Sequence, residues 1–296
     1  MLVETLQKEF LIERKFEGLR ESTLTVYKDF FKSWNEWLNT QSIEQVEDIS
    51  PLVIKQYLRR CADNGNKPKT INTKLKLLRA FSRWLVEESL VDQQFTKGVK
   101  AVREDSVPKI VRQEDIQLVL SHLRRVKRSR RNYVLVLFMI GTGCRLSEIE
   151  RLNWTDIDFT NSLITILESK TRKHQSVPLS DTLARELLDW KLFVDKKFNK
   201  PPQPLFTTRN GTRITKNGIQ NFFKRLKKTL EIQGDFSTHC MRNFYIKGLL
   251  KNGANLREVQ LLARHSKIQV TQGYIGYFAH ELKETIDQSN PLNDLI

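Results

Sequence analysis

Residues 141–179 read GTGCRLSEIERLNWTDIDFTNSLITILESKTRKHQSVPL and contain the only strong β-strand signal in the chain. Within this stretch, residues 154–159 and 163–167 are rich in apolar and β-branched side chains, and a turn-forming Thr-Asn-Ser sequence separates them. A second turn signal, Lys-Thr-Arg-Lys, leads into a third strand at residues 174–179. The stretch therefore predicts a small three-stranded antiparallel sheet whose second turn is basic.

Helical periodicity dominates the first part of the chain. Large apolar residues recur at spacings of three and four, which is the period of one helix face. They are Leu24, Tyr27, Phe31, Trp34 and Leu38, and then Ile71, Leu75, Leu78, Phe81 and Leu85. Shorter patterns begin at Leu2 and after Ser50-Pro51, where Ser can cap a helix and Pro can occupy its first position. We predict four helices, packed through their aromatic side chains into a small all-α domain.

The same periodicity continues around the predicted sheet. Further helices are expected to open at residue 113 and to cover residues 133–140, 144–152, 181–198, 216–230, 239–251 and 255–263. The fold class is therefore mainly α with a small antiparallel three-stranded sheet. Residues 97–108 are polar, lose the periodicity and end in Pro, so we interpret them as a linker. They would separate a helical domain, 1–96, from a second domain, 109–279, which a tail, 280–296, follows.

Composition narrows the class of protein. Hydrophobic residues make up 39% of the chain and charged residues 28%, which is typical of a soluble globular protein. No apolar run reaches the roughly 18 residues that cross a membrane. The three cysteines lack paired spacing, so we expect neither a disulfide scaffold nor a CxxC zinc site, and a reducing compartment such as the cytoplasm fits best. GxxxxGK[ST], GxGxxG and HExxH motifs are absent from the sequence, so we expect no cofactor and no metal.

Positive charge is concentrated in the second domain. The formal net charge is +16, of which the first 105 residues account for +2 and the remainder for +14. Lys and Arg provide most contacts to nucleic-acid phosphates, so nucleic acid is the expected partner. Six of the eight residues 124–131 are basic and form either a track for a phosphate backbone or a solvated helix end. The polar face of residues 216–228 has two readings as well, a helix in the major groove or a basic solvated surface.

The residues that we expect to contact DNA are basic or amide-bearing and lie in the second domain. They are Arg124, Arg125, Lys127, Arg128, Arg172, Lys173, Lys216, Gln220, Asn221, Lys224, Arg225 and Arg264.

A further set of residues fits phosphodiester chemistry. Without a metal, this reaction needs fixed cations, because negative charge builds up on the non-bridging oxygens in the transition state. Arginine suits this role because its planar guanidinium binds two oxygens at once. A nucleophile is also needed, together with a general acid for the leaving 5′ oxygen. Side chains of these kinds follow one another as Arg145, Glu148, Lys170, His239, Arg242, His265 and Tyr274.

Their joint order resembles that of the tyrosine recombinases, also called phage integrases, and most closely their compact Xer-like members. Residues 141–158, GTGCRLSEIERLNWTDID, resemble the first arginine box, and residues 169–179, SKTRKHQSVPL, the β-hairpin lysine segment. Residues 238–244, THCMRNF, resemble the H-x-L-R-H box, and residues 261–274, LLARHSKIQVTQGY, the L-L-G-H-x₈-Y box. The resemblance covers residues 110–280 well, and the four-helix part fits the family's core-binding domain more loosely.

The resemblance implies how the strand is cut. Tyr274 would attack the scissile phosphate to give a 3′-phosphotyrosyl link, and Lys170 would protonate the leaving 5′ oxygen. His239 would assist proton transfer to or from the tyrosine. Tyr277 and Lys173 are the rivals of Tyr274 and Lys170, and spacing from the flanking motifs favours the first pair.

The resemblance also implies how charge is stabilised. Arg145 and Arg242 would clamp the non-bridging oxygens, and His265 would hydrogen-bond the phosphate. Glu148 would position Arg145 or a neighbouring histidine. The covalent link keeps the phosphodiester energy, so rejoining would need neither ATP nor metal.

The sequence departs from the family pattern at three positions. Met241 replaces the usual Leu, which is a tolerable change in packing. Asn243 occupies the position where a second His is common, and Arg264 the position of the Gly before His265. The arginine at position 264 would add a phosphate contact or alter the turn.

We therefore expect a site-specific DNA recombinase. The resemblance implies a two-domain, C-shaped clamp around duplex DNA, and a homotetramer on two sites or a heterotetramer with a related recombinase, with the tail exchanged between protomers. Accessory proteins can assist. One alternative is a type IB topoisomerase-like nicking and closing enzyme, and another is a catalytically silent DNA-binding regulator. The four-helix part begins almost at Met1, which favours an Xer-like or resolvase-like enzyme over an integrase with an additional arm-binding domain.

Overall fold

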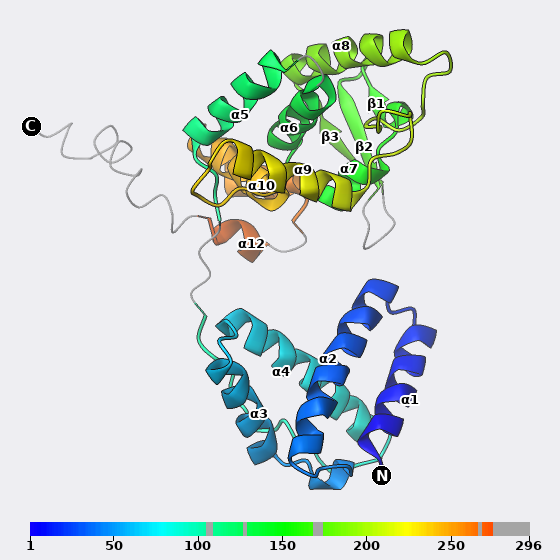
Figure 1. Cartoon of the computed structure of the whole chain (residues 1–296), viewed down its shortest axis with the longest axis vertical. Coiled ribbons are helices and arrows are strands. Elements are labelled where there is room, and N and C mark those ends of the chain that lie inside the picture. Colours follow the sequence, from blue (N-terminus) through cyan, green and yellow to red (C-terminus); the bar gives the residue numbers. More distant parts are fainter. Residues whose placement is uncertain (105–108, 127–128, 168–173, 266–267, 275–296) are drawn as a thin grey trace, which may run out of the picture. The chain divides into compact units, whose positions relative to one another are not determined.

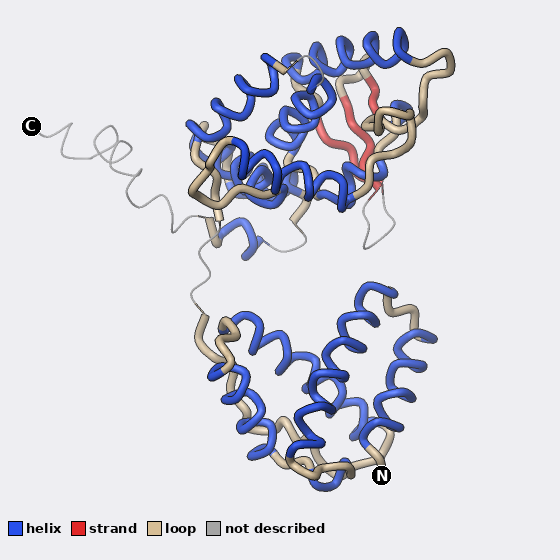
Figure 2. The backbone as a smooth tube through the Cα atoms, viewed as in Figure 1, coloured by secondary structure: helices blue, strands red, loops and turns tan. Residues whose placement is uncertain are grey.

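The computed structural model describes residues 1–104, 109–126, 129–167, 174–265 and 268–274. The chain divides into two compact units, Met1–Ser106 and Val107–Ile296, and each is described by itself. In the described part, helices dominate both units, and the strands are confined to the second (Figures 1 and 2).

The first unit contains the four predicted helices. They are α1 (Val3–Phe16), α2 (Glu21–Thr40), α3 (Pro51–Asp63) and α4 (Pro68–Glu87), with a 3-10 turn, η1 (Val46–Asp48), between α2 and α3. Ser50 caps α3 as predicted, because its hydroxyl accepts the amide hydrogen of Val53 while Pro51 occupies the first turn.

Aromatic side chains form the core of this unit, as the periodicity predicts. Phe10, Phe31, Trp34 and Phe81 are all buried. The ring of Phe81 lies 5.5 Å from that of Phe10 and 5.3 Å from that of Phe31, both edge to face. These rings hold α1, α2 and α4 together and are not available to stack on bases.

The beginning of the predicted linker belongs to the first unit. Val99 is buried in its core, and the carbonyl of Val99 accepts a hydrogen bond from Arg79. Asn72 binds both the amide and the carbonyl of Val102 at 2.8 Å. Residues 97–102 therefore pack on α4, which polar composition alone did not indicate.

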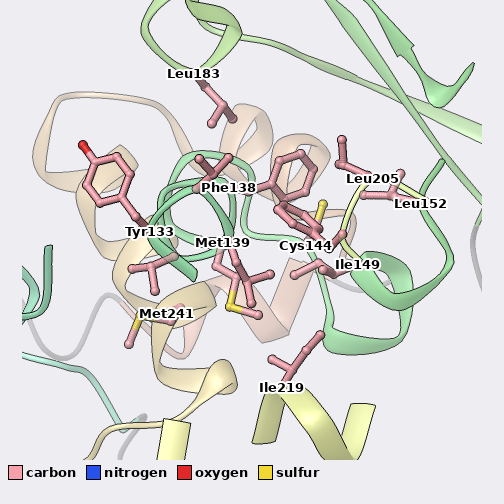
Figure 3. Packing of buried hydrophobic residues seen from close by; sticks show 14 of the residues in the cluster. Tyr133, Phe138, Met139, Cys144, Ile149, Leu152, Leu183, Leu205, Ile219 and Met241 are labelled. Carbon is pink, nitrogen blue, oxygen red and sulfur yellow. The ribbon is translucent and has the colours of Figure 1, made fainter. Parts of the chain in front are cut away.

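The second unit surrounds α6 with helices and places a sheet at one side (Figure 2). Its helices are α5 (Gln113–Arg125), α6 (Arg130–Thr142), α7 (Leu146–Arg151), α8 (Asp181–Lys197), α9 (Lys216–Thr229), α10 (Thr238–Lys251), α11 (Leu256–Ala263) and α12 (Ile268–Gln272). The middle of α6 is buried, including Tyr133, Phe138 and Met139 (Figure 3). The helix packs against α5, α8 and α10. A helix that is apolar all round is expected in such a central place.

The predicted sheet is present, with β2 (Leu163–Leu167) between β1 (Ile157–Asp158) and β3 (His174–Pro178), all antiparallel. Ile164 of β2 pairs with Ile157 on one side and with Val177 on the other, and all three are buried in the core. The first strand is shorter than predicted. Residues 154–156 form a 3-10 turn, η3, because Asn153 and Asp156 cap each other.

Among the described residues, every helix is too short or too polar to cross a bilayer.

Candidate active site

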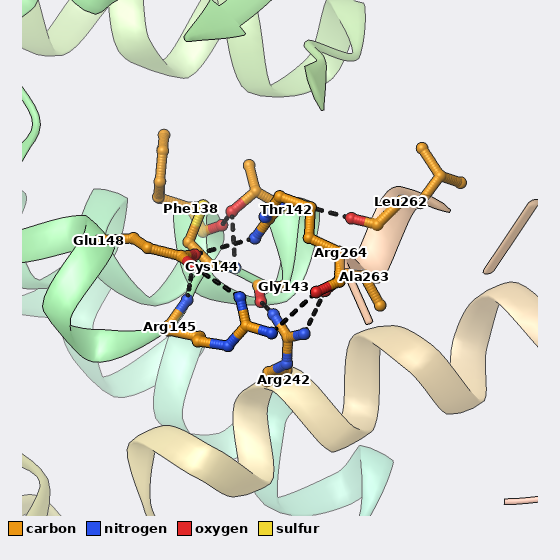
Figure 4. Close-up of polar contacts among 10 residues, drawn as sticks. All are labelled: Phe138, Thr142, Gly143, Cys144, Arg145, Glu148, Arg242, Leu262, Ala263 and Arg264. Carbon is orange, nitrogen blue, oxygen red and sulfur yellow. Dashed lines mark hydrogen bonds and ion pairs between the residues drawn. The ribbon is translucent and has the colours of Figure 1, made fainter. Parts of the chain in front are cut away.

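Segments far apart in the chain meet where α7, α10 and α11 converge (Figure 4). Arg145 is the residue immediately before α7, and Arg242 lies in the second turn of α10. Arg264 and His265 follow α11, and Tyr274 follows α12. Hydrogen bonds to the end of α11 bring Arg145 and Arg242 together, and Tyr274 is bound to Asn243, the residue after Arg242.

Arg145 is held on both sides of its guanidinium. Nη1 donates to Oε1 of Glu148 at 2.8 Å, and Nη2 donates to the carbonyl of Arg264 at 2.8 Å. The backbone amide of Arg145 donates to Oε2 of the same carboxylate. The side chain of Arg145 is 36% exposed, so its guanidinium is accessible to a ligand from solvent.

Arg242 lies deeper than Arg145. Its Nη1 donates to the carbonyl of Gly143 at 2.5 Å, and its Nη2 donates to the carbonyl of Ala263. Burial lowers the pKa of Arg242 to about 10, and the positive charges of Arg145 and Arg264 contribute. The group therefore remains charged at neutral pH, and the crowding of cations favours an anion beside them.

The two arginines donate hydrogen bonds to the carbonyls of adjacent residues. Arg242 binds the carbonyl of Ala263 and Arg145 that of Arg264, so the end of α11 fixes both guanidinium groups in one place (Figure 4). A pair of fixed planar guanidiniums is the arrangement that binds the non-bridging oxygens of a phosphodiester.

Glu148 is buried between two arginines. Burial raises the pKa of its carboxyl, but Arg264 and the hydrogen bonds from Arg145 outweigh this effect and bring the pKa below its ordinary value. Glu148 is therefore ionised, and it holds the guanidinium of Arg145.

His265 is held as a neutral imidazole. Its Nδ1 lies 2.9 Å from the hydroxyl of Thr271, which is buried, and its amide donates to the carbonyl of Gln260. Burial lowers the pKa of His265 to about 4, and Arg242, Arg145 and Arg264 add to the effect. The contact with Thr271 orients the ring, and Nε2 is the nitrogen on its opposite side.

Tyr274 is buried, with 6% of its surface exposed. Its hydroxyl donates to Oδ1 of Asn243 at 2.7 Å, and Nδ2 of Asn243 donates to the carbonyl of Lys109 at 2.8 Å. The ring packs with Ile246, Val259 and Ala263. The hydroxyl is thus bound to α10 at the residue after Arg242.

Two of the residues that the resemblance assigns to the chemistry need separate comment. His239 is exposed in the first turn of α10, one turn before Arg242. Lys170 and the rival residues Lys173 and Tyr277 lie outside the described residues, as does the tail, 280–296.

The predicted DNA-contacting residues fall into three groups. Lys127, Arg128, Arg172 and Lys173 lie outside the described residues. Exposed side chains on α9 include Gln220, Asn221, Lys224 and Arg225, opposite the buried face of that helix. The remaining four, Arg124, Arg125, Lys216 and Arg264, differ in their surroundings.

Arg124 and Arg125 are exposed at the end of α5, and Arg124 also binds the hydroxyl of Tyr133 at 2.8 Å. Lys216 forms an ion pair with Glu150 at 3.3 Å. Arg264 points inward, with only 3% of its side chain exposed, and pairs with Glu148. We therefore remove Arg264 from the DNA-contacting set, because its two Nη atoms are directed to the carbonyl of Leu262 and to the carboxylate of Glu148.

Sequence reasoning missed the contacts of three other residues. Asn243 stood out as a departure from the family pattern, but its bond to Tyr274 could not be anticipated. Thr271 and Gly143 gave no signal of their own, and only the structure shows them binding His265 and Arg242. Among the described residues, no group of three or more His, Cys, Asp or Glu could hold a metal ion.

Comparison with known families identifies the family of the chain. The sequence model of the phage integrase family matches residues 109–280, and that of the phage integrase N-terminal SAM-like domain matches residues 8–89. The chain belongs to the phage integrase family. It is a tyrosine recombinase, an enzyme of site-specific DNA recombination, as the resemblance predicts.

Relatives of similar length support the Xer-like character. The chain is 27% identical over 297 residues to tyrosine recombinase XerD of Oceanobacillus iheyensis, covering 98% of this chain and 99% of the relative. It is 26% identical to tyrosine recombinase XerC of Pediococcus pentosaceus, covering 97% and 96%.

Solved structures support the fold. The Tn1549 transposon integrase in complex with transposon right end DNA matches with a TM-score of 0.80 at 19% identity, covering 98% of this chain and 99% of that one. A lambda integrase dimer bound to a core site matches with a TM-score of 0.77 at 15% identity, covering 91% and 97%.

Proposed function

We propose that Tyr274 is the nucleophile of this recombinase, and that Arg145, Arg242 and His265 bind the scissile phosphate. The observation that carries the proposal is the attachment of both arginines to consecutive carbonyls at the end of α11, ten residues before Tyr274 along the chain. Because the guanidiniums are fixed before substrate arrives, little reorganisation is needed as charge develops on the phosphate.

We infer a reaction in two steps. The phenolic oxygen of Tyr274 forms a bond to phosphorus while the bond to the 5′ oxygen breaks. Lys170 gives its proton to that oxygen, and His239 takes part in removing the proton from the phenol. In the second step, a 5′-hydroxyl attacks the phosphotyrosyl link and displaces Tyr274. Each step exchanges one ester for another, so the number of phosphate ester bonds does not change.

The substrate of this chemistry is duplex DNA at a recombination site. Integrases of the same fold are bound to DNA in two of the matched structures. The assembly is a tetramer on two sites, formed by this chain alone or with a related recombinase, and residues 280–296 are exchanged between protomers. The enzyme acts on DNA in the cytoplasm.

Covalent trapping tests the proposal. Wild type, Tyr274→Phe and Tyr277→Phe are incubated in EDTA with nicked duplexes from candidate element ends, and the products are separated on a denaturing gel. We expect a protein–DNA adduct from wild type and from Tyr277→Phe but none from Tyr274→Phe. An adduct lost only in Tyr277→Phe would move the nucleophile. Specific binding without any adduct would favour a silent regulator.

A further inference from the structure

Arg264 has an unusual backbone conformation for an arginine. It ends α11 with φ 55° and ψ 50°, in the left-handed region. For a residue other than glycine this conformation costs about 1–2 kcal/mol. The family box has Gly at this position, which adopts the conformation without strain. An arginine here therefore needs a compensating interaction of its side chain.

The side chain of Arg264 turns into the protein and binds Glu148. Nη2 donates to Oε2 of Glu148 at 3.0 Å, and Nη1 donates to the carbonyl of Leu262 at 3.0 Å. Nε is buried and has no hydrogen-bond partner within the described part of the chain. A buried ion pair with an unsatisfied donor adds little net stability, so folding alone does not account for it.

Arg264 contacts Arg145 by two routes. The first is direct, because the carbonyl of Arg264 accepts a hydrogen bond from Nη2 of Arg145. The second passes through Glu148, whose Oε1 binds Arg145 and whose Oε2 binds Arg264. Oε2 also accepts the backbone amide of Arg145, so Arg264 adds a third hydrogen bond to the carboxylate that orients the guanidinium of Arg145.

The second route also concerns charge. With Gly at position 264, the whole negative charge of Glu148 would act on Arg145 and weaken its attraction for a phosphate. The guanidinium of Arg264 shares that carboxylate at 3.0 Å and offsets its charge. Both Nη atoms of Arg264 are bound inside the protein, to Leu262 and Glu148, so its influence on a phosphate passes through Arg145.

We propose that Arg264 is a positioning residue, which holds Arg145 and neutralises Glu148 so that Arg145 keeps its full charge for the scissile phosphate. The inference rests on the proposed function, in which Arg145 clamps that phosphate. It assigns a role to a side chain that replaces the glycine of the family box.

The test separates DNA binding from cleavage. Single-turnover adduct formation on a nicked duplex is measured at saturating protein for wild type, Arg264→Gly and Arg264→Lys, alongside the dissociation constant for DNA. Arg264→Gly fits the left-handed backbone and removes only the side chain. We expect its cleavage rate to fall about tenfold to a hundredfold, since small misplacements of catalytic groups have effects of this size. The dissociation constant should change little, and Arg264→Lys should restore part of the rate.

Two controls distinguish positioning from a general effect. Lys251→Ala removes one positive charge from an exposed site at the end of α10 and should cleave like wild type. In a Glu148→Gln background, Arg264→Gly should cost less than in wild type, because the two residues act through one contact. The midpoint of the His265 titration, followed by NMR, should rise in Arg264→Gly, because one of the cations that lower the pKa of His265 is gone.

Several outcomes would overturn the inference. Cleavage by Arg264→Gly at the wild-type rate would do so, as would a loss that matches a loss of DNA binding. Equal losses from Arg264→Gly in the wild-type and Glu148→Gln backgrounds would show that the side chain does not act through Glu148. Failure of wild type itself to form an adduct would contradict the proposed function instead, so the two failures are distinguishable.

Discussion

The hydroxyl of Tyr274 donates a hydrogen bond to Oδ1 of Asn243, and the 2.7 Å contact is buried. An amide oxygen is a weak base and cannot take the phenolic proton. For nucleophilic attack, that proton must pass to another group. The bond to Asn243 therefore does not itself activate Tyr274, and the carbonyl of Lys109 accepts a hydrogen bond from the other side of the amide.

Removing this contact should loosen Tyr274. We expect Asn243→Ala to lower the free energy of unfolding by about 1–3 kcal/mol, because the buried bond from Tyr274 and the part-buried bond to the carbonyl of Lys109 are both lost. Nitration of Tyr274, followed by mass spectrometry, should become faster. Asn243→Asp keeps an acceptor for the hydroxyl but loses the donor to the carbonyl of Lys109, so it separates the two contacts and should be nitrated more slowly than Asn243→Ala. Equal nitration of wild type and Asn243→Ala would show that the bond does not restrain the tyrosine.

Gly143 connects α6 to the arginine site and tolerates no side chain. Its φ is +58°, and a Cβ would come within 2.3 Å of the ring of Tyr245, while its carbonyl binds Arg242. Gly143→Ala should lower the free energy of unfolding by about 2–4 kcal/mol, from backbone strain together with overpacking. It should also weaken DNA cleavage, because Arg242 shifts with the carbonyl.

The matched control for that substitution is Gly248→Ala on α10, where a Cβ meets nothing within 4 Å. Alanine there should raise the free energy of unfolding by about 0.5–1 kcal/mol, since it favours the helix over glycine. Circular dichroism during thermal unfolding measures both variants. If the two alanines have equal effects, the clash with Tyr245 is not what restricts position 143.

Sequence periodicity predicted the helices well because burial of one face decides them. Helices α4 and α9 occupy their predicted positions, and the three strands lie in the predicted order. The error in β1 has a local cause. Asn153 and Asp156 exchange hydrogen bonds and form a 3-10 turn, and such side-chain to backbone bonds compete with strand pairing.

The contacts within the candidate site could not be predicted from the sequence. Motif spacing identified Arg145 and Arg242, yet the carbonyls that hold them could not be deduced from the sequence. The sequence analysis listed Arg264 among the DNA contacts, because arginines are seldom buried unless paired. Its partner, Glu148, lies 116 residues earlier in the chain, and only the fold brings the two together.

The low pKa of His265 predicts its behaviour in acid. An ordinary histidine titrates near 6.5, whereas burial and three arginines bring the pKa of His265 to about 4. Between these values the unfolded chain binds a proton that the folded protein does not. The free energy of unfolding should therefore fall as the pH drops from about 6.5 to about 4.

NMR titration checks this directly, with His265→Gln identifying the signal. The midpoint should lie near 4, and the difference in unfolding free energy between wild type and His265→Gln should shift against wild type as the pH falls. His265 should still be neutral at pH 6, so it adds no step to the cleavage rate there. A midpoint near 6.5 would show that the arginines do not act on this imidazole.

Helix α9 offers a test of sequence recognition. Gln220 and Asn221 are exposed amides on a helix whose opposite face is buried, and Lys224 and Arg225 follow one turn later. Amides read bases by paired hydrogen bonds, each worth about 1–3 kcal/mol of discrimination, whereas lysines bind phosphates without regard to sequence.

If α9 lies in the major groove, replacing both Gln220 and Asn221 by Ala should relax the preferred site in a selection from random duplexes. Lys224→Ala should instead weaken binding to all sequences alike and reduce the slope of log K against log salt by about one. An unchanged preference in the double variant would mean that the polar face of α9 is a solvated surface and that bases are read elsewhere.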